Sequence, residues 1–339
     1  MALLNETKKK ISIQRFDNVE VVRGLASVAV VFYHFTYFLQ DGNPLKQFCG
    51  YGYLGVDCFF VISGFVLPLS FFQKNYSLRD APLQFLKRAW RIEIPYWACI
   101  ALMAIKDAGE QWYADRYHFK MPATYSTKSL LVHAIHANTW FGMPFIRDLF
   151  WTLALDWQFY LFLLIAFFLI KQRAWFLRYP LYVALAATRW LDTPNWAMYY
   201  VFAFLAGIMF FHYTVKFIST YELLACWLLL SYFADEKMWL PHTLAIFSAC
   251  AILFFVQHAA KPFLFLGKIS YALYLTHTFS GWTLVSSYLK YNPNASEWDK
   301  TLYVVVSVLL CIPFAYLFYK YIEETAQRYS KLVFNYLTL

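Results

Sequence analysis

The stretch VVRGLASVAVVFYHF, residues 21–35, belongs to an apolar run long enough to cross a membrane, yet it contains an arginine and a histidine. Ionisable side chains are costly in hydrocarbon and usually have a partner or a function there. Arg23 and His34 are eleven positions apart, which on an α-helix puts them within about 20° of one face and about 16 Å apart along the axis. One helix face is therefore predicted to carry a cation near one end and an imidazole, a candidate general base, towards the other.

The composition indicates the class of protein. The chain has 339 residues, of which 61% are hydrophobic and only 14% are charged, whereas about a quarter of the residues in a soluble domain are charged. We predict an all-α, polytopic membrane protein. The net charge of +9 does not indicate nucleic-acid binding, because the basic residues gather at the ends of apolar segments, as the positive-inside rule describes. The six cysteines lack metal-ligand spacing, so we expect no metal site, and a disulfide between Cys49 and Cys58 is disfavoured.

About ten apolar segments are long enough to cross a bilayer with some tilt. They cover residues 19–40, 54–73, 88–106, 149–170, 175–190, 196–213, 217–233, 240–257, 270–290 and 301–320. Placing the N-terminus in the cytoplasm leaves most lysine and arginine residues inside, which predicts a plasma (inner) membrane protein with both termini cytoplasmic. Residues 1–18 and 324–339 would then be cytoplasmic segments on either side of a transmembrane domain at 19–323, with the first segment retained rather than cleaved as a signal peptide.

The longest loop on this topology, about residues 107–148, lies outside the cell. It contains His118, His133, His136 and Trp140. Loops of this length are usually functional or act as lids. We therefore expect this loop to lie near an acceptor site.

Three titratable residues from three segments are predicted to lie at a similar depth, towards the outer surface: His34, Asp57 and Asp156. Either carboxylate could orient the His34 ring and prepare it as a general base. Asp57 could instead be only the first-turn acid of a helix, and His34 could be a hydrogen-bonded structural residue. Glu20 lies three positions before Arg23, so the two side chains can neutralise each other.

A basic cluster introduces the third segment in FLKRAWRIEIPYW, residues 85–97. Lys87, Arg88 and Arg91 would lie at its cytoplasmic end. There they would either anchor the orientation of the helix or grip a phosphate or pyrophosphate, which arginine contacts through two hydrogen bonds. His277, in the ninth segment, would either line a path across the membrane or hydrogen-bond to a neighbouring helix, and the residues alone do not separate these two roles.

Five motifs in this order resemble the acyltransferase-3 family of integral membrane O-acyltransferases. They are Arg23 and His34 with ten residues between them, GVDCFFVISGF (55–65), KRAWRIEIPYW (87–97), WTLALDWQFY (151–160) and LGKISYALYLTH (266–277). A sixth stretch, YKYIEETAQRY at 319–329, is similar to the closing segment of the family, with Thr325 where a proline is usual. Asp156 stands where the family usually has a glutamate.

The resemblance implies a ten-helix enzyme that takes an acyl group, usually acetyl, from acyl-CoA on the cytoplasmic side. The acceptor would be a hydroxyl of a cell-envelope glycan or lipid-linked sugar, as in O-acetylation of polysaccharides. His34 matches the essential histidine of the family, Arg23 its first-helix arginine, and Arg88 with Arg91 its Arg-x-x-Arg pair. We expect the membrane domain to act without a fused SGNH hydrolase-like domain, either alone or with a partner.

The residues and the resemblance fit one scheme. Acyl-CoA, the donor substrate, would be held by Arg23, Lys87, Arg88, Arg91 and His277. His34, oriented by Asp57 or Asp156, would remove the proton from the acceptor hydroxyl as that oxygen attacks the acyl carbon. A covalent acyl-histidine is a variant of this scheme, and no metal takes part.

The alternative function is a proton-coupled transporter or flippase of an envelope precursor, with His34, Asp57 and Asp156 as a proton relay. Inverted repeats or paired broken helices would favour a transporter, and the sequence shows neither. A scaffold without chemistry would leave the buried polar residues unexplained. The sequence does not identify the acceptor or the length of the acyl chain, and it leaves homo-oligomerisation open; the expected partners are acyl-CoA, a glycan acceptor and membrane lipids.

Overall fold

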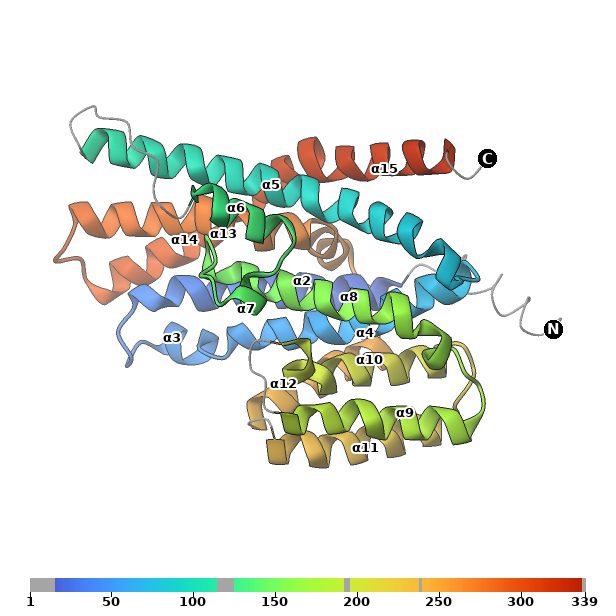
Figure 1. Cartoon of the computed structure of the whole chain (residues 1–339). Coiled ribbons are helices and arrows are strands. Elements are labelled where there is room, and N and C mark those ends of the chain that lie inside the picture. Colours follow the sequence, from blue (N-terminus) through green and yellow to red (C-terminus); the bar gives the residue numbers. More distant parts are fainter. Residues whose placement is uncertain (1–15, 115–124, 192–195, 238–239, 337–339) are drawn as a thin grey trace. The chain divides into compact units, whose positions relative to one another are not determined.

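The structure, a computed structural model, describes residues 16–114, 125–191, 196–237 and 240–336, and these residues form helices and connecting turns without a β-strand. Each of the ten predicted segments falls on a helix. These helices are α2 (Asp17–Phe35), α4 (Gly55–Gln73), α5 (Ala81–Ala114), α8 (Trp151–Ile170), α9 (Trp175–Ala187), α10 (Val201–Thr214), α11 (Thr220–Lys237), α12 (Leu240–Phe255), α13 (Lys261–Tyr291) and α14 (Glu297–Phe318). Figure 1 shows these helices in chain order. The shorter helices are α3 (Pro44–Cys49), α6 (Thr127–Ala134), α7 (Asn138–Phe141) and α15 (Glu324–Tyr336).

Five helical stretches in the described ranges are both long enough and apolar enough to cross a membrane. They are Asp17–Phe38, Pro44–Gln73, Asp148–Ile170, Ala197–Thr214 and Glu297–Val333. Two further stretches, Thr220–Ala234 and Leu240–Phe255, are apolar but shorter. Helices of this kind are typical of a polytopic membrane protein, whereas the count of ten crossings and the cytoplasmic location of both ends remain predictions.

Two helices extend beyond the boundaries expected from the sequence. Helix α5 continues to Ala114, past the predicted end of the third segment at residue 106. Helix α14 passes through a π-helical turn, η8 (Tyr319–Glu323), directly into α15. Thr325 is compatible with this continuation because, unlike a proline, it has a backbone N–H and no ring that clashes with the preceding turn.

The described residues divide into two compact units. Within the described ranges, the first unit comprises residues 16–30, 51–81 and 158–270, and the second comprises 31–50, 82–157 and 271–336. Helices α2, α8 and α13 contribute residues to both units. The predicted site residues are divided accordingly: Arg23 and Asp57 belong to the first unit, and His34, Asp156 and the other predicted residues belong to the second.

The first unit is built around helix α10, which packs against α4 (Figure 1). Two glycines allow this close approach, because a Cβ atom on Gly64 would lie 2.1 Å from the Phe204 carbonyl oxygen and one on Gly207 would lie 2.1 Å from that of Val61. Small residues at helix contacts are a common way for membrane helices to gain van der Waals contact. The Phe159 ring of α8 stacks on Phe204 with centroids 4.0 Å apart, which completes this tightly packed core.

Helices α2 and α13 also meet in the first unit through glycines. A Cβ atom on Gly24 would lie 2.9 Å from the Gly267 backbone nitrogen, and one on Gly267 would lie 2.3 Å from the Glu20 carbonyl oxygen. The two backbones are therefore in direct contact, with no room for a larger side chain between them.

The second unit is organised around the C-terminal part of α13. The Tyr271 hydroxyl donates to the Ile92 carbonyl of α5 at 2.9 Å, and the Cys99 thiol of α5 donates to the Leu275 carbonyl at 3.1 Å. The Tyr274 hydroxyl lies 2.6 Å from the Thr152 hydroxyl at the start of α8. These hydrogen bonds fix α13 against α5 and α8. All six cysteines of the chain are free thiols.

Candidate active site

Arg23 lies on helix α2 in the first unit. It forms the predicted ion pair with Glu20, with Nη1 3.9 Å from Oε1, and both side chains are partly exposed. Pairs three residues apart on a helix contribute about 0.2–0.5 kcal/mol to its stability. The pair offsets the charge of Arg23 and leaves part of the guanidinium accessible.

His34 lies near the end of the same helix, in the second unit. Its half-buried ring contacts Tyr33, with centroids 5.4 Å apart, and His277, with centroids 5.1 Å apart and ring planes inclined by 33°. Within the described part of this unit, the His34 imidazole makes no hydrogen bond. A ring that is partly accessible and not engaged in a structural hydrogen bond can meet a substrate.

His277 is fully buried on α13 beside His34. Its Nδ1 lies 2.7 Å from the Tyr274 carbonyl oxygen, which can only accept, so Nδ1 carries the proton. In the neutral ring, the other nitrogen is then an acceptor. That nitrogen, Nε2, is buried and has no hydrogen-bond partner among the described residues. The fold therefore places a ring with an unprotonated nitrogen, His277 Nε2, next to the ring of His34.

Arg88 of α5 and Asp156 of α8 form an ion pair between Nη2 and Oδ2. Both side chains are mostly buried, and the Arg88 guanidinium also lies 5.8 Å from the centroid of the Trp157 ring. Charge-assisted hydrogen bonds of this type are among the stronger ones in proteins. The two residues predicted to bind a donor phosphate and to orient His34 are therefore engaged with each other.

This ion pair corrects the depths expected from the sequence. Arg88 was expected at the cytoplasmic end of its segment and Asp156 about two turns from the outer surface. Two groups in direct contact lie at the same depth, so these expectations are not both right. The error arises because hydropathy defines the apolar core of a helix but not the vertical offset between neighbouring helices, which their side-chain contacts determine.

The other two basic residues of the cluster lie on the same turns of α5. Arg91 is exposed and Lys87 is half-buried. Arg91 follows Arg88 by three positions, so their side chains project from adjacent turns of one face. Arg91 is thus the more accessible member of the predicted Arg-x-x-Arg pair.

A second buried pair lies near the first and was not foreseen. His136 Nε2 lies 2.7 Å from Glu93 Oε1, and the His136 ring stacks against Trp157 with centroids 5.9 Å apart. Trp157 therefore contacts both Arg88 and His136. The His136 backbone has a φ of 51°, in the left-handed region that non-glycine residues adopt infrequently. The sequence indicates only that His136 is a loop residue, because its partner is 43 positions away.

The predicted outer loop has its own polar interior. Arg147 Nη2 donates to both carboxylate oxygens of Asp107, at 2.7 and 2.6 Å, and the Tyr125 hydroxyl donates to the same carboxylate at 2.6 Å. This contact ties the end of the loop to α5. Burial raises the pKa of Tyr125, and the Asp107 carboxylate raises it further. Trp140 is exposed, and His118 lies outside the described residues.

His133 is the buried histidine of this loop. Its Nδ1 donates to the Ser129 carbonyl at 2.8 Å, and its Nε2 accepts the Ile146 backbone N–H at 3.0 Å. Both nitrogens are thus satisfied only in the neutral ring. Burial lowers the pKa of His133, which favours the same neutral form and indicates a structural role.

Asp57 has a different partner from the one expected. Its Oδ2 accepts the Nδ1–H of His242 at 2.9 Å in the first unit, while Oδ1 is buried and has no partner among the described residues. His242, which sequence reasoning did not single out, lies in the first turn of α12, as Asp57 does in α4. The sequence feature that indicates His242 is a titratable residue in the first turn of an apolar segment. The proposed action of Asp57 on His34 remains a prediction.

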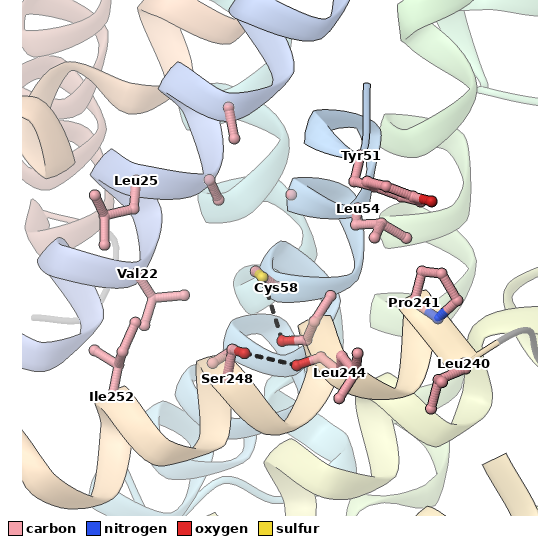
Figure 2. Close-up of a pocket in the computed structure, with 15 residues that line it drawn as sticks. Val22, Leu25, Tyr51, Leu54, Cys58, Leu240, Pro241, Leu244, Ser248 and Ile252 are labelled. Atoms are coloured by element: carbon pink, nitrogen blue, oxygen red, sulfur yellow. Dashed lines mark hydrogen bonds between the residues drawn. The ribbon is translucent and has the colours of Figure 1, made fainter. Parts of the chain in front are cut away.

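The first unit also contains an apolar cavity of about 540 Å³ (Figure 2). Val22 and Leu25 of α2, Leu54, Cys58 of α4, and Leu244 and Ile252 of α12 are among its lining residues. The two polar lining groups that Figure 2 connects by dashed lines are satisfied locally. The Ser248 hydroxyl donates to the Leu244 carbonyl at 2.7 Å, and the Cys58 thiol donates to the Ala245 carbonyl at 3.6 Å. The cavity therefore presents mainly hydrocarbon.

Metal chemistry has no candidate site in the described ranges, where no group of three or more histidine, cysteine or acidic side chains could hold an ion. The polar residues of the second unit instead offer imidazole, guanidinium and carboxylate groups. Imidazole is suited to proton transfer and guanidinium to binding an anion.

Comparison with known proteins identifies the family. Residues 16–320 match the model of the Acyl_transf_3 family, described as an acyltransferase domain. A similar curated protein is the peptidoglycan O-acetyltransferase OatA of Listeria monocytogenes serovar 1/2a (strain ATCC BAA-679 / EGD-e), which is 26% identical over 193 residues. The match covers 51% of this chain and only 28% of that relative. No solved structure matches the chain. Because the family model covers nearly all of the sequence, the chain belongs to the acyltransferase-3 family of membrane acyltransferases.

Proposed function

We propose that the protein is a membrane O-acyltransferase that moves an acyl group, by preference acetyl, from acyl-CoA to a hydroxyl of a cell-envelope glycan or lipid-linked sugar. The observation that carries this proposal is the accessible His34 ring, at the position that matches the family's histidine, in a chain of this family. The relative named a peptidoglycan O-acetyltransferase makes peptidoglycan the first acceptor to test.

In the proposed reaction, a nitrogen of His34 removes the proton of the acceptor hydroxyl while the hydroxyl oxygen attacks the acyl carbon. An ester C–O bond forms, and the C–S bond of the thioester breaks. His34 then returns the proton to the leaving thiolate, which gives free coenzyme A. Atoms and charge balance without any further reactant.

The donor would be held through its phosphates by Arg91 and Lys87, which lie on accessible turns of α5. Arg88 would contribute through the same surface while its pair with Asp156 fixes its position. Arg23 and His277 stay in the proposed donor-binding set, and Asp57 stays a proposed assistant of His34. This assignment gives Asp156 the role of positioning Arg88.

The decisive experiment follows transfer of labelled acetyl from acetyl-CoA to peptidoglycan fragments by the purified protein. We expect His34→Ala to lower the rate by at least about 100-fold, since general-base catalysis contributes about 10²–10⁴-fold. His258→Ala is the matched control, because His258 is exposed and outside the site. Transfer by His34→Ala at the wild-type rate would refute the role of His34.

A binding measurement with acetyl-CoA distinguishes the proposed enzyme from the alternative function, a proton-coupled transporter. We expect acetyl-CoA to raise the melting temperature of the wild type, and Arg91→Ala to lose most of this shift. Arg79→Ala, at an exposed arginine of the first unit, is the control. If acetyl-CoA leaves the melting temperature unchanged in all three proteins, the proton-coupled transporter becomes the better explanation.

A further inference from the structure

The expected orienting groups of His34 are engaged elsewhere. Asp156 pairs with Arg88 and Asp57 pairs with His242. A general base usually has a partner that selects its tautomer and holds its ring. In its own unit, the His34 ring lies against the rings of Tyr33 and His277, and of these two only His277 has ring nitrogens that can accept a hydrogen bond.

His277 has the properties of such a partner. Its Nδ1–H is committed to the Tyr274 carbonyl, so its Nε2 is fixed as an acceptor. The rings of His34, Phe35 and Tyr274 lie around it, with centroids 5.1, 6.1 and 6.1 Å from its own. Its Nε2 is fully buried and has no partner among the described residues. A buried acceptor without a partner is costly and calls for an explanation.

We propose that His277 is the positioning residue of His34: its Nε2 accepts a ring N–H of His34 when the acceptor hydroxyl is bound. This proposal rests on the function proposed above. The second nitrogen of His34 then carries the lone pair and faces the hydroxyl. Such hydrogen bonds are often long before substrate binds and shorten in the reactive complex, and the two ring centroids already lie 5.1 Å apart.

Two conservative substitutions of His277 distinguish a role in positioning His34 from a purely structural role. The amide of Asn reaches the position of Nδ1, so His277→Asn keeps the hydrogen bond to Tyr274 and loses the acceptor near His34. The amide of Gln reaches the position of Nε2, so His277→Gln keeps an acceptor near His34 and loses the bond to Tyr274. A purely structural role, which depends on the bond to Tyr274, predicts that Asn is the better replacement.

The measurement is kcat and KM of both variants in the acetyl-CoA assay. We expect His277→Asn to lower kcat by about 100-fold with little change in KM for acetyl-CoA, and His277→Gln to retain at least about ten times the kcat of His277→Asn. A kcat of His277→Gln equal to or below that of His277→Asn overturns the proposal. A wild-type protein that binds acetyl-CoA but transfers no acetyl refutes the proposed function itself.

If neither variant folds, the wild-type protein provides the test. With ¹⁵N-labelled histidine, and with coenzyme A and unacetylated peptidoglycan fragments present, the signal of an unprotonated His277 Nε2 should shift towards that of a hydrogen-bonded nitrogen. The same addition to His34→Ala should leave the signal in place. An unshifted signal in the wild type overturns the proposal.

Discussion

Arg88 of α5 and Asp156 of α8 form an ion pair that is mostly shielded from solvent. Removing one member would leave the other charge without its partner, which costs more than the pair itself contributes. We expect a double-mutant cycle with Arg88→Ala and Asp156→Ala to give a coupling energy of about 0.5–3 kcal/mol. Thermal unfolding of the wild type, the two single variants and the double variant in the same detergent measures this coupling energy. Strictly additive losses of stability would show that the pair does not stabilise the fold.

Asp57 and His242 join α4 to α12 inside the first unit. Because Asp57 is buried, Asp57→Ala removes the partner of the His242 ring, and we expect a loss of about 3 kcal/mol or more in the free energy of unfolding. Asp41→Asn is the control, since the Asp41 side chain is almost fully exposed and surface pairs contribute little. Equal stabilities of the two variants would contradict the importance of the buried pair.

The contact between α4 and α10 depends on glycines. A Cβ atom at Gly207 would overlap the Val61 carbonyl oxygen, so we expect Gly207→Ala to cost about 1–3 kcal/mol. Gly109 of α5 has no atom within 4 Å of the corresponding position, and Gly109→Ala should stabilise its helix slightly. Melting temperatures that move in opposite directions confirm the packing, whereas a stable Gly207→Ala would contradict it.

The stability of the predicted outer loop should depend on pH through His133. Burial lowers the pKa of this ring in the folded state, so between that value and about 6.5 the unfolded loop binds more protons than the folded one. The contribution to stability is therefore complete above about pH 6.5 and is lost as the pH falls towards the folded pKa. This loss of stability can be measured by hydrogen exchange of the Ile146 amide, corrected for its intrinsic rate. The variant His133→Gln should remove the pH dependence.

How far the sequence alone predicts this protein can be judged from particular residues. The ten helices follow from apolar segments whose signals are local, and the pair of Glu20 with Arg23 follows from a spacing of three residues. Asp57 and His242, in contrast, are separated by 185 positions, and Arg88 and Asp156 by 68. Hydropathy does not determine which faces of distant helices meet. The residues proposed to carry the chemistry are therefore recognisable in the sequence as unusual, but their partners are not.

Glu93 and His136 are another pair whose contact the sequence does not predict. The sequence places Glu93 inside an arginine-rich motif and His136 in a loop, and neither position indicates an interaction. Their contact depends on a left-handed backbone conformation at His136, which a single sequence does not reveal for a residue other than glycine. Such conformations often occur where a structure constrains a functional residue.

The glycine contact between α2 and α13 has a consequence for substitutions in the first unit. Gly24 and Gly267 bring the two backbones of the first unit so close that a methyl group on either residue would overlap main-chain atoms of the other helix. A larger residue at either glycine would force the two helices of the first unit apart, so both positions are closed to substitution although neither has a side chain that could react.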